Sequence, residues 1–436
     1  MTSTDRLTTA RIVTFWLPLA GTWLMMAVEG PFLAALIARL PDPAYNLAAY
    51  GVAYALALLV EGPVIMMMSA STALVRDRVT YLRLRNFTQG LNVVLTALMV
   101  VLLLPPVFGV VTGGVLDLDP EVARRTWTAV ALLLPWPGTI GFRRFYQGLL
   151  IRSGRTRLVA AGTVLRLAAM SATGLLAAAH GTLDGAAVGA AALSAGVIVE
   201  ALASRVMAHR TVGELLAREP QVTPPSFPEM AAFYWPLALT STLSLGIQPV
   251  VTFFMSHARA SLESLAVLPV VMALVFLFRS LGLAAQEVFI ALAGDEGEGL
   301  PALRRFAAGL GLATAGALTV IAWSPLADLW FSGVSGLPPS LAEFARLPAR
   351  ILAPIPALTV LLSWQRARCV SSRVTRPVTL ATVLEVAGVV SVLALTVAGL
   401  DWVGAAAAAT ALVCGRLAAN SYLSVRLSSL PGTTGS

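Results

Sequence analysis

The sequence predicts an all-α polytopic membrane protein whose twelve transmembrane helices form two pseudo-symmetric six-helix lobes. Composition is the first observation: 57% of the 436 residues are hydrophobic and 12% are charged, whereas soluble domains carry about 25% charged residues. The second is a series of long apolar runs, and the third is a set of motifs that recur half a chain apart. Together they disfavour a soluble globular fold and indicate a duplicated membrane domain.

Each predicted span is an apolar run of about 20 residues or more, which is long enough to cross a bilayer as a helix. The first run is too long for the core of a cleaved signal peptide and other spans follow it, so we take it as an uncleaved span. The predicted spans cover residues 12–38, 47–74, 87–110, 126–150, 158–179, 184–207, 230–256, 261–291, 302–325, 345–368, 377–399 and 402–424.

The charges in the loops predict the orientation. With the amino terminus inside, the outward loops hold few arginines, diluted by acidic residues such as Asp117 and Asp119, and most other loop arginines lie inside. This asymmetry follows the positive-inside rule and predicts two cytoplasmic termini in a bacterial inner membrane. The inward arginines gather at residues 6–11, 76–85, 152–157, 210–218, 304–305 and 373–376.

The motif FWLPLAGT, which contains Pro18, returns half a chain later as FYWPLALT around Pro236. Likewise GTVLRLA at Gly162 returns as ATVLEVA at Ala381, at nearly the same spacing. The alternative is that Leu- and Ala-rich helices resemble one another by composition alone. We predict an N-terminal six-helix lobe over 1–207, a cytoplasmic linker over 208–229 and a C-terminal six-helix lobe over 230–436. Two such lobes would hold a substrate between them and rock against each other.

Polar side chains inside the spans are the candidate cavity residues, because a charge in hydrocarbon costs free energy unless it faces a cavity or a partner. The repeat places Glu61 and Arg279 at equivalent positions, so we expect them to interact across the lobe interface; the alternative is that each pairs within its own lobe. Arginines outnumber carboxylates among these groups, which favours an anionic substrate. Arg144 and Arg368 are expected to reach the membrane surface. The candidates are Glu29, Glu61, Arg143, Gln147, Gln248, Arg279, Gln286, Glu287 and Arg366.

Prolines inside the spans are the candidate helix kinks, because proline removes a backbone donor and interrupts the hydrogen-bond ladder. Glu29 and Glu61 each precede a Gly-Pro pair, so freed carbonyls beside a carboxylate could hold an ion or a proton; a packing kink is the alternative. Gln248 and its following proline stand at the matching place in the second half, so the two lobes are not chemically equivalent. The predicted kinks are Pro18, Pro31, Pro63, Pro236 and Pro249.

Several other function classes find no support in the sequence. All thirty basic residues are Arg and they are scattered in loops, which is not the stripe expected of a nucleic-acid-binding protein. We see no nucleotide-binding loop, catalytic triad or zinc signature, so we expect neither an enzyme nor a resident metal or cofactor. The run Met66 to Met68 is interpreted as packing rather than as a metal site.

Two sets of motifs resemble a known family. The twelve spans in two halves, with prolines in the first and seventh, resemble the MATE-like multidrug/oligosaccharidyl-lipid/polysaccharide flippase superfamily. Within it, AAYGVAYAL at Ala48, the Gly62-Pro63 pair, RDR at Arg76 and FYWPLAL at Phe233 resemble the progressive ankylosis protein family. The likeness extends to Pro249-Val-Val and to the helix start near Arg350. One departure is Gln248, where the family has a basic residue.

The resemblance implies an exporter of small organic or phosphate-containing anions such as citrate, pyrophosphate or nucleotides. We expect alternating access, a monomer in the bilayer, and a proton or sodium ion as the possible coupling ion. Two alternatives stay open. A multidrug antiporter for organic cations would need an acidic cavity, and a lipid-linked saccharide flippase would need a lateral opening.

Overall fold

The computed structural model describes residues 7–219, 226–292, 299–371 and 376–428, and helices form nearly all of that chain. Parts of the predicted linker (220–225) and of the arginine-rich loops (residue 6 and 372–375) lie outside this description. Within it, nine helical segments are long and apolar enough to cross a membrane. The fourth, seventh and twelfth predicted spans lie on further helices, so every predicted span coincides with helix.

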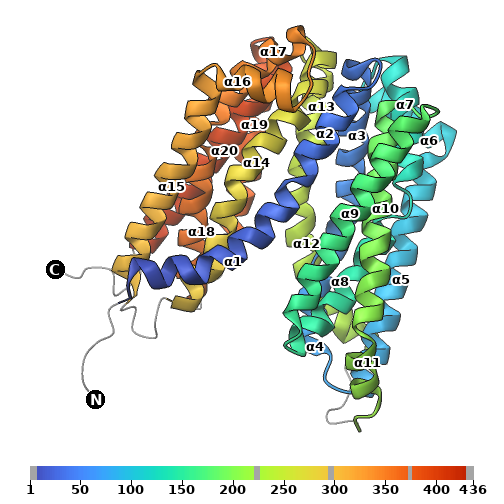
Figure 1. The fold of residues 1–436 in the computed structure, drawn as a ribbon, viewed down its shortest axis with the longest axis vertical. Helices are drawn as coiled ribbons and strands as arrows, with labels where there is room; N and C mark the ends of the chain where they lie inside the picture. Colours follow the sequence, from blue (N-terminus) through green and yellow to red (C-terminus); the bar gives the residue numbers. More distant parts are fainter. Residues whose placement is uncertain (1–6, 220–225, 293–298, 372–375, 429–436) are drawn as a thin grey trace. The chain divides into compact units, whose positions relative to one another are not determined.

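The first half of the chain holds the helices drawn from blue to green in Figure 1. Its elements are α1 (Thr9–Ala27), α2 (Glu29–Ala38), α3 (Pro43–Glu61), the 3₁₀ turn η1 (Gly62–Val64), α4 (Met67–Leu74), α5 (Arg78–Leu103), α6 (Pro105–Gly109), the π-helical turn η2 (Val110–Val115), α7 (Pro120–Leu132), α8 (Trp136–Arg152), α9 (Thr156–His180), α10 (Gly185–Met207) and α11 (His209–Leu216).

The second half repeats this order in outline in the yellow-to-red helices of Figure 1, with the single helix α14 in place of α3, η1 and α4. Its elements are α12 (Phe227–Leu245), α13 (Ile247–Ser256), α14 (Ser261–Leu292), α15 (Leu300–Trp323), α16 (Leu326–Asp328), the π-helical turn η3 (Leu329–Val334), α17 (Pro339–Leu352), α18 (Ile355–Ser371), α19 (Arg376–Leu393), the π-helical turn η4 (Ala394–Gly399) and α20 (Gly404–Ser428).

The repeat extends to single hydrogen bonds. Asn46 accepts a bond from the backbone N–H of Ala186 (3.1 Å) at the start of α10, and Ser264 accepts one from Ala405 (3.0 Å) at the start of α20. In the register that the sequence motifs define, Asn46 is equivalent to Ser264, and the two alanines are equivalent to each other. Composition alone would not reproduce these capping contacts, so the duplication is a property of the fold.

Contacts group the chain into two compact units that differ from the two sequence halves. Unit 1 comprises Met1–Ala35 and Ala258–Ser436, and unit 2 comprises Leu36–His257. The first helix therefore packs with the second half of the chain, and α12 and α13 pack with the first half. The predicted boundaries at 208–229 follow the covalent repeat, whereas the units follow where each helix buries its apolar face. Part of the predicted linker is helical, because α11 forms within it.

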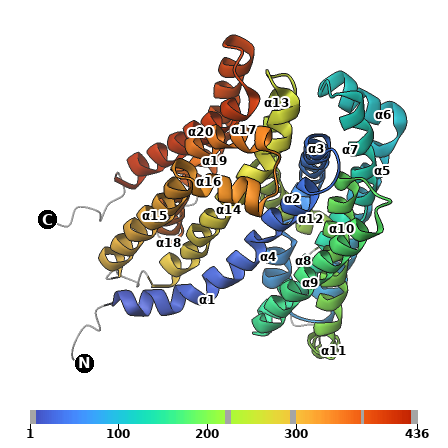
Figure 2. The ribbon, with the colours of Figure 1, turned by 45° about the horizontal axis from the view of Figure 1, so that its top comes forward.

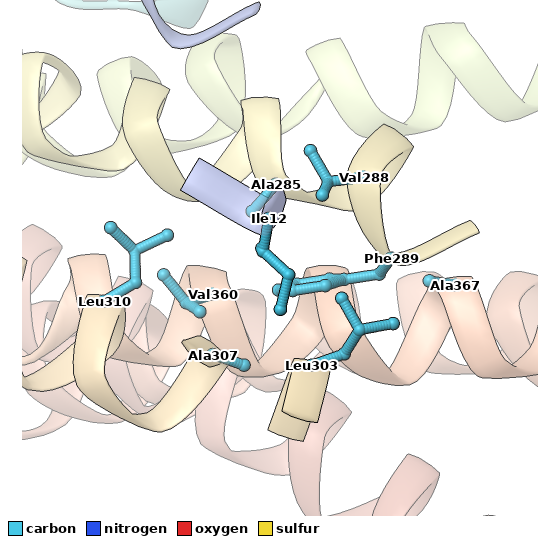
Figure 3. Close-up of a cluster of buried hydrophobic side chains, with 9 residues drawn as sticks. All are labelled: Ile12, Ala285, Val288, Phe289, Leu303, Ala307, Leu310, Val360 and Ala367. Atoms are coloured by element: carbon cyan, nitrogen blue, oxygen red, sulfur yellow. The ribbon is translucent and has the colours of Figure 1, made fainter. Parts of the chain in front are cut away.

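In unit 1, α1 lies along α14, as both ribbon views show (Figures 1 and 2). Ile12 of α1 is fully buried among residues of α14, α15 and α18, and Phe289 lies at the centre of the same cluster (Figure 3). Trp16 meets Phe306 edge to face at 5.7 Å, and its indole N–H donates to the carbonyl of Leu281 (3.2 Å). Burial of these large apolar groups holds the first helix in unit 1.

In unit 2, α8 is the central helix, and α4, α5 and α10 pack around it. Two glycines allow α5 and α8 to approach closely: a Cβ on Gly138 would lie 2.9 Å from the Thr96 hydroxyl, and one on Gly141 would overlap the Asn92 side chain. This close packing fixes the orientation of α8, which carries much of the polar cluster described next.

Candidate functional site: buried charges in each unit

Glu200 is the centre of the polar cluster in unit 2. Its side chain on α10 is almost fully buried, with 1% exposed. Arg143 of α8 donates to Oε2, Gln147 of α8 donates to Oε1 (3.1 Å), and Arg166 of α9 lies 3.6 Å from Oε2. Three helices therefore converge on one carboxylate, which suits the need of a buried charge for paired and hydrogen-bonded surroundings.

Glu61 is the second buried carboxylate of unit 2 and ends α3, directly before the break in the second span. The indole N–H of Trp136 donates to its Oε2 at 2.6 Å. Arg143, Arg144 and Arg166 lie within electrostatic reach of it. Glu61 thus has partners in its own unit, as the alternative interpretation expected. Its predicted interaction with Arg279, which belongs to unit 1, stays a prediction.

The break after Glu61 is covered by α12. The hydroxyl of Ser241 donates to the carbonyl of Gly62 (2.7 Å), and the hydroxyl of Tyr234 donates to the carbonyl of Pro63 (2.5 Å). A Cβ on Gly62 would lie 2.8 Å from the Cα of Thr242, so only glycine permits this approach. At this one of the two predicted Gly-Pro breaks, the carbonyls of Gly62 and Pro63 therefore each accept a hydrogen bond from a hydroxyl.

Unit 1 holds a second cluster of buried charges, in which three arginines surround one carboxylate. Arg416 of α20 binds Glu385 of α19 through Nε (2.8 Å) and Nη2 (2.7 Å), and it also donates to the Thr359 hydroxyl (3.2 Å). Within the part of the chain that the structure describes, Arg366 of α18 donates only to the Thr382 hydroxyl, at 3.4 Å. Arg279, in the middle of α14, lies within electrostatic reach of Arg366, Arg416 and Glu385. Among the described residues, neither Arg279 nor Arg366 has an ion-pair partner.

The remaining predicted cavity residues lie elsewhere. Glu29 is buried in the first turn of α2, and Gln248 is half-buried in the first turn of α13. Gln286 is half-buried on α14, and its neighbour Glu287 is exposed. Arg144, expected at the membrane surface, is half-buried, and its guanidinium lies 3.9 Å from the sulfur of Met68. The place of these groups in a substrate cavity stays a prediction.

The predicted kinks divide into two kinds. Pro31 and Pro249 follow breaks between α1 and α2 and between α12 and α13, and Pro63 lies in the 3₁₀ turn after α3. Each lacks the N–H that would continue the ladder, so a break nearby is expected. By contrast, α1 runs through Pro18 and α12 runs through Pro236 without interruption. A bend at those two positions stays a prediction.

Several central residues of the two clusters were not among those predicted from the sequence: Trp136, Arg166, Glu200, Glu385 and Arg416. A signal was present, because GTVLRLA and ATVLEVA are the repeated motif, and they differ at Arg166 and Glu385. Glu200 and Arg416 are simply charged residues within predicted spans, which the rule applied to the other candidates would also have found.

No known family profile matches the chain, and no curated protein sequence matches it. Solved structures do match. An inward-facing multidrug resistance MATE family transporter of the MOP superfamily is 15% identical, with a TM-score of 0.71 over 97% of this chain and 99% of that one. Lipid II flippase MurJ, in an inward closed conformation, is 12% identical, with a TM-score of 0.74 over 95% of this chain and 88% of that one.

A third similar structure is a MOP superfamily transporter from Pyrococcus furiosus, described by the reverse polarity of its binding pocket. It is 14% identical, with a TM-score of 0.64 over 98% of this chain and 99% of that one. At these identities the likeness is one of fold. Nearly the whole of this chain therefore has the MATE-type fold of a multi-pass membrane protein.

Proposed function

We propose that the protein is an alternating-access transporter that exports a small organic or phosphate-containing anion. The observation that carries this proposal is the excess of guanidinium groups in unit 1. Arg279, Arg366 and Arg416 lie within electrostatic reach of one another, and Glu385 is committed to Arg416. Positive charge without a carboxylate is costly at membrane depth, and an anionic substrate would offset that cost.

The MATE-type fold supports transport as the general activity, because two matching six-helix repeats are a design used for alternating access. The resemblance to the progressive ankylosis protein family supports an anion of the citrate, pyrophosphate or nucleotide kind. We place both termini in the cytoplasm, on the distribution of loop arginines. A proton or sodium gradient is the proposed driving force, and no cofactor is needed for the proposed cycle.

Transport by purified protein in liposomes tests the proposal. Labelled citrate, labelled pyrophosphate and a lipophilic cation should be compared, each with and without a proton gradient. We expect uptake of at least one anion and none of the cation. Transport of the cation alone would favour the multidrug alternative, and transbilayer movement of a lipid-linked saccharide without anion transport would favour the flippase.

A matched pair of variants on α18 links the activity to the site. Arg366→Gln should reduce anion transport at least tenfold, because it removes a guanidinium without a carboxylate partner. Arg368→Gln makes the same change two residues further along the same helix and should leave transport within about twofold of wild type. Equal effects of the two variants would contradict the assignment of Arg366 to the substrate.

A further inference from the structure

A pocket of about 330 Å³ lies in unit 2 where α8 ends and α11 begins. It is distinct from the buried clusters, because it opens at the ends of these helices rather than within them. The last turn of α8, the helix α11 and the residues just after α11 form its walls. The lining residues are Leu149, Arg152, Ser153, Thr211, Glu214, Leu215 and Arg218.

Helix carboxyl ends normally repel an anion, but the carbonyls that end α8 are already covered. The backbone N–H of Ser153 donates to Leu149 (3.0 Å), and that of Arg155 donates to Leu150 (2.8 Å). The N–H of Gly154 donates to Ile151 (3.0 Å), with Gly154 in the left-handed conformation (φ 71°) that favours glycine. Three of the last carbonyls of α8 are thus hydrogen-bonded within the turn, which reduces their repulsion of an anion.

The charged groups that face the pocket are mainly cationic. Arg152 donates to the carbonyl of Thr72 (2.7 Å), and Arg218 makes one long bond to the carbonyl of Arg76 (3.5 Å). Neither guanidinium pairs with a carboxylate among the described side chains. The one acidic residue of the lining, Glu214, is bound to Arg155 at 2.6 Å. Two guanidiniums therefore keep donor capacity for a ligand.

A neutral donor lies beside these charges. The hydroxyls of Ser153 and Thr211 are 3.2 Å apart on the pocket wall. Ser153 donates its proton to the carbonyl of Leu150 (3.0 Å) and Thr211 accepts from Arg155 (3.0 Å), so Thr211 is the hydroxyl that can donate to a ligand. Arginine forks bind phosphate oxygens through paired, charge-assisted hydrogen bonds, and hydroxyls commonly complete such sites. The donor set therefore matches a phosphate ester better than a cation or an apolar ligand.

The position of the pocket at the ends of membrane spans indicates which kind of molecule supplies that phosphate. Two spans end here, since α8 stops at Arg152 and α10 stops just before α11. On α11, Val212 and Leu215 are buried whereas Arg210 is exposed, as expected of a short helix lying at a membrane surface. Basic pockets between spans on the cytoplasmic side are suited to lipid head groups. We propose that this pocket binds the phosphate of an anionic phospholipid.

Thermal unfolding of the detergent-solubilised protein tests the proposal without any transport assay. One arm adds phosphatidylglycerol, one adds phosphatidylcholine and one adds glycerol 3-phosphate. We expect phosphatidylglycerol to raise the midpoint by several degrees more than phosphatidylcholine. Stabilisation by glycerol 3-phosphate alone would overturn the lipid as the ligand, and no stabilisation by either phosphate compound would overturn the site.

Two variants on the same short stretch assign the effect to the pocket. Arg218→Gln should abolish most of the stabilisation by phosphatidylglycerol, and its cost to the fold should be small because Arg218 makes only the one long bond. Arg210→Gln removes the same charge from the exposed face of α11 and should keep the stabilisation. Equal loss in both variants would show a diffuse attraction to surface charge and overturn the pocket.

Discussion

The same pair of neighbouring helices occurs in each unit and holds one acid and one base. The helix that carries the acid differs between the two units. In unit 2 the base is on the first helix, Arg166 of α9, and the acid is on the second, Glu200 of α10. In unit 1 the acid comes first, Glu385 of α19, and the base follows, Arg416 of α20. The repeat thus preserves the two helices and the presence of an acid–base pair between them. It does not preserve which helix carries the acid. The framework is duplicated while its buried chemistry has diverged.

The largest expected difference between the two pairs is the loss of stability when the carboxylate of each is replaced by an amide. Glu200 binds Arg143 and Gln147 and lies 3.6 Å from Arg166, so Glu200→Gln removes the carboxylate that two buried guanidiniums share. Breaking a buried ion pair in this way costs about 3–5 kcal/mol. Glu385→Gln breaks the direct ion pair of one guanidinium rather than two, and that one, Arg416, is half-buried and keeps its bond to Thr359. Arg279 and Arg366 lose only a longer-range attraction to Glu385, so the cost should be smaller. Thermal unfolding in one detergent measures both variants.

The control for that comparison is Glu287→Gln, which makes the same change on an exposed side chain of α14. It should leave the unfolding midpoint nearly unchanged, since substitutions away from buried networks are usually small. A larger loss for Glu385→Gln than for Glu200→Gln would show that the number of paired guanidiniums does not set the cost.

The second span of each sequence half also differs, here in whether the helix is continuous. The span of unit 2 breaks at Gly62, where α12 approaches, whereas the equivalent residue in unit 1 is Ser280 within the continuous α14. Gly62→Ala should destabilise by about 1–3 kcal/mol, because its Cβ would meet the backbone of Thr242. Gly90→Ala on α5, which has open space around it, should be neutral or stabilising. Equal behaviour of the two variants would contradict a tight contact at the break.

The helices α1 and α12 each pack with the other half of the chain, and an aromatic side chain on each donates a hydrogen bond there. Tyr234 of α12 donates to the carbonyl of Pro63. Trp16, its equivalent on α1, donates to the carbonyl of Leu281, which is the equivalent of Pro63 in the repeat. Tyr234→Phe should cost about 0.5–1.5 kcal/mol, the worth of a hydrogen bond at the broken span. Tyr422→Phe, near the end of α20, is the control and should cost less, because its hydroxyl accepts one long bond from Arg426 (3.4 Å).

The measurement for this pair is the free energy of unfolding at a fixed detergent concentration. A loss from Tyr234→Phe no larger than that from Tyr422→Phe would show that water or another donor replaces the hydroxyl at Pro63. Trp16→Phe is the less informative variant, since it removes ring area against Phe306 together with the hydrogen bond.

The span pattern was predictable because hydropathy and the offset motifs are local properties of the chain. Breaks such as that between α7 and α8 at Leu133–Pro135, within one predicted span, depend on which carbonyls find other donors. The grouping of α1 with unit 1 could not be read from sequence order, since it depends on the surface that buries Ile12. In the site, Arg166 and Glu385 lay in the repeated motif, but their partners are set by which helices are neighbours.

The smallest expected effect concerns the ion pairs of Glu121 in the first turn of α7 and of Glu343 on α17. Glu121 accepts bonds from Arg124 and Arg125, which lower its pKa from the ordinary 4.5 to about 2; on α17, Arg346 pairs with Glu343 at 3.1 Å.

Because the folded pKa of Glu121 lies below the unfolded value, its charge stabilises the fold above pH 4.5, and this stabilisation is lost as the pH falls toward 2. The destabilisation by Glu121→Gln at pH 7 should therefore shrink across that window, and added salt should also reduce it because the pair is exposed. Unfolding midpoints of wild type and variant at several pH values measure this. A pH-independent difference would mean that Glu121 acts through packing rather than through its charge.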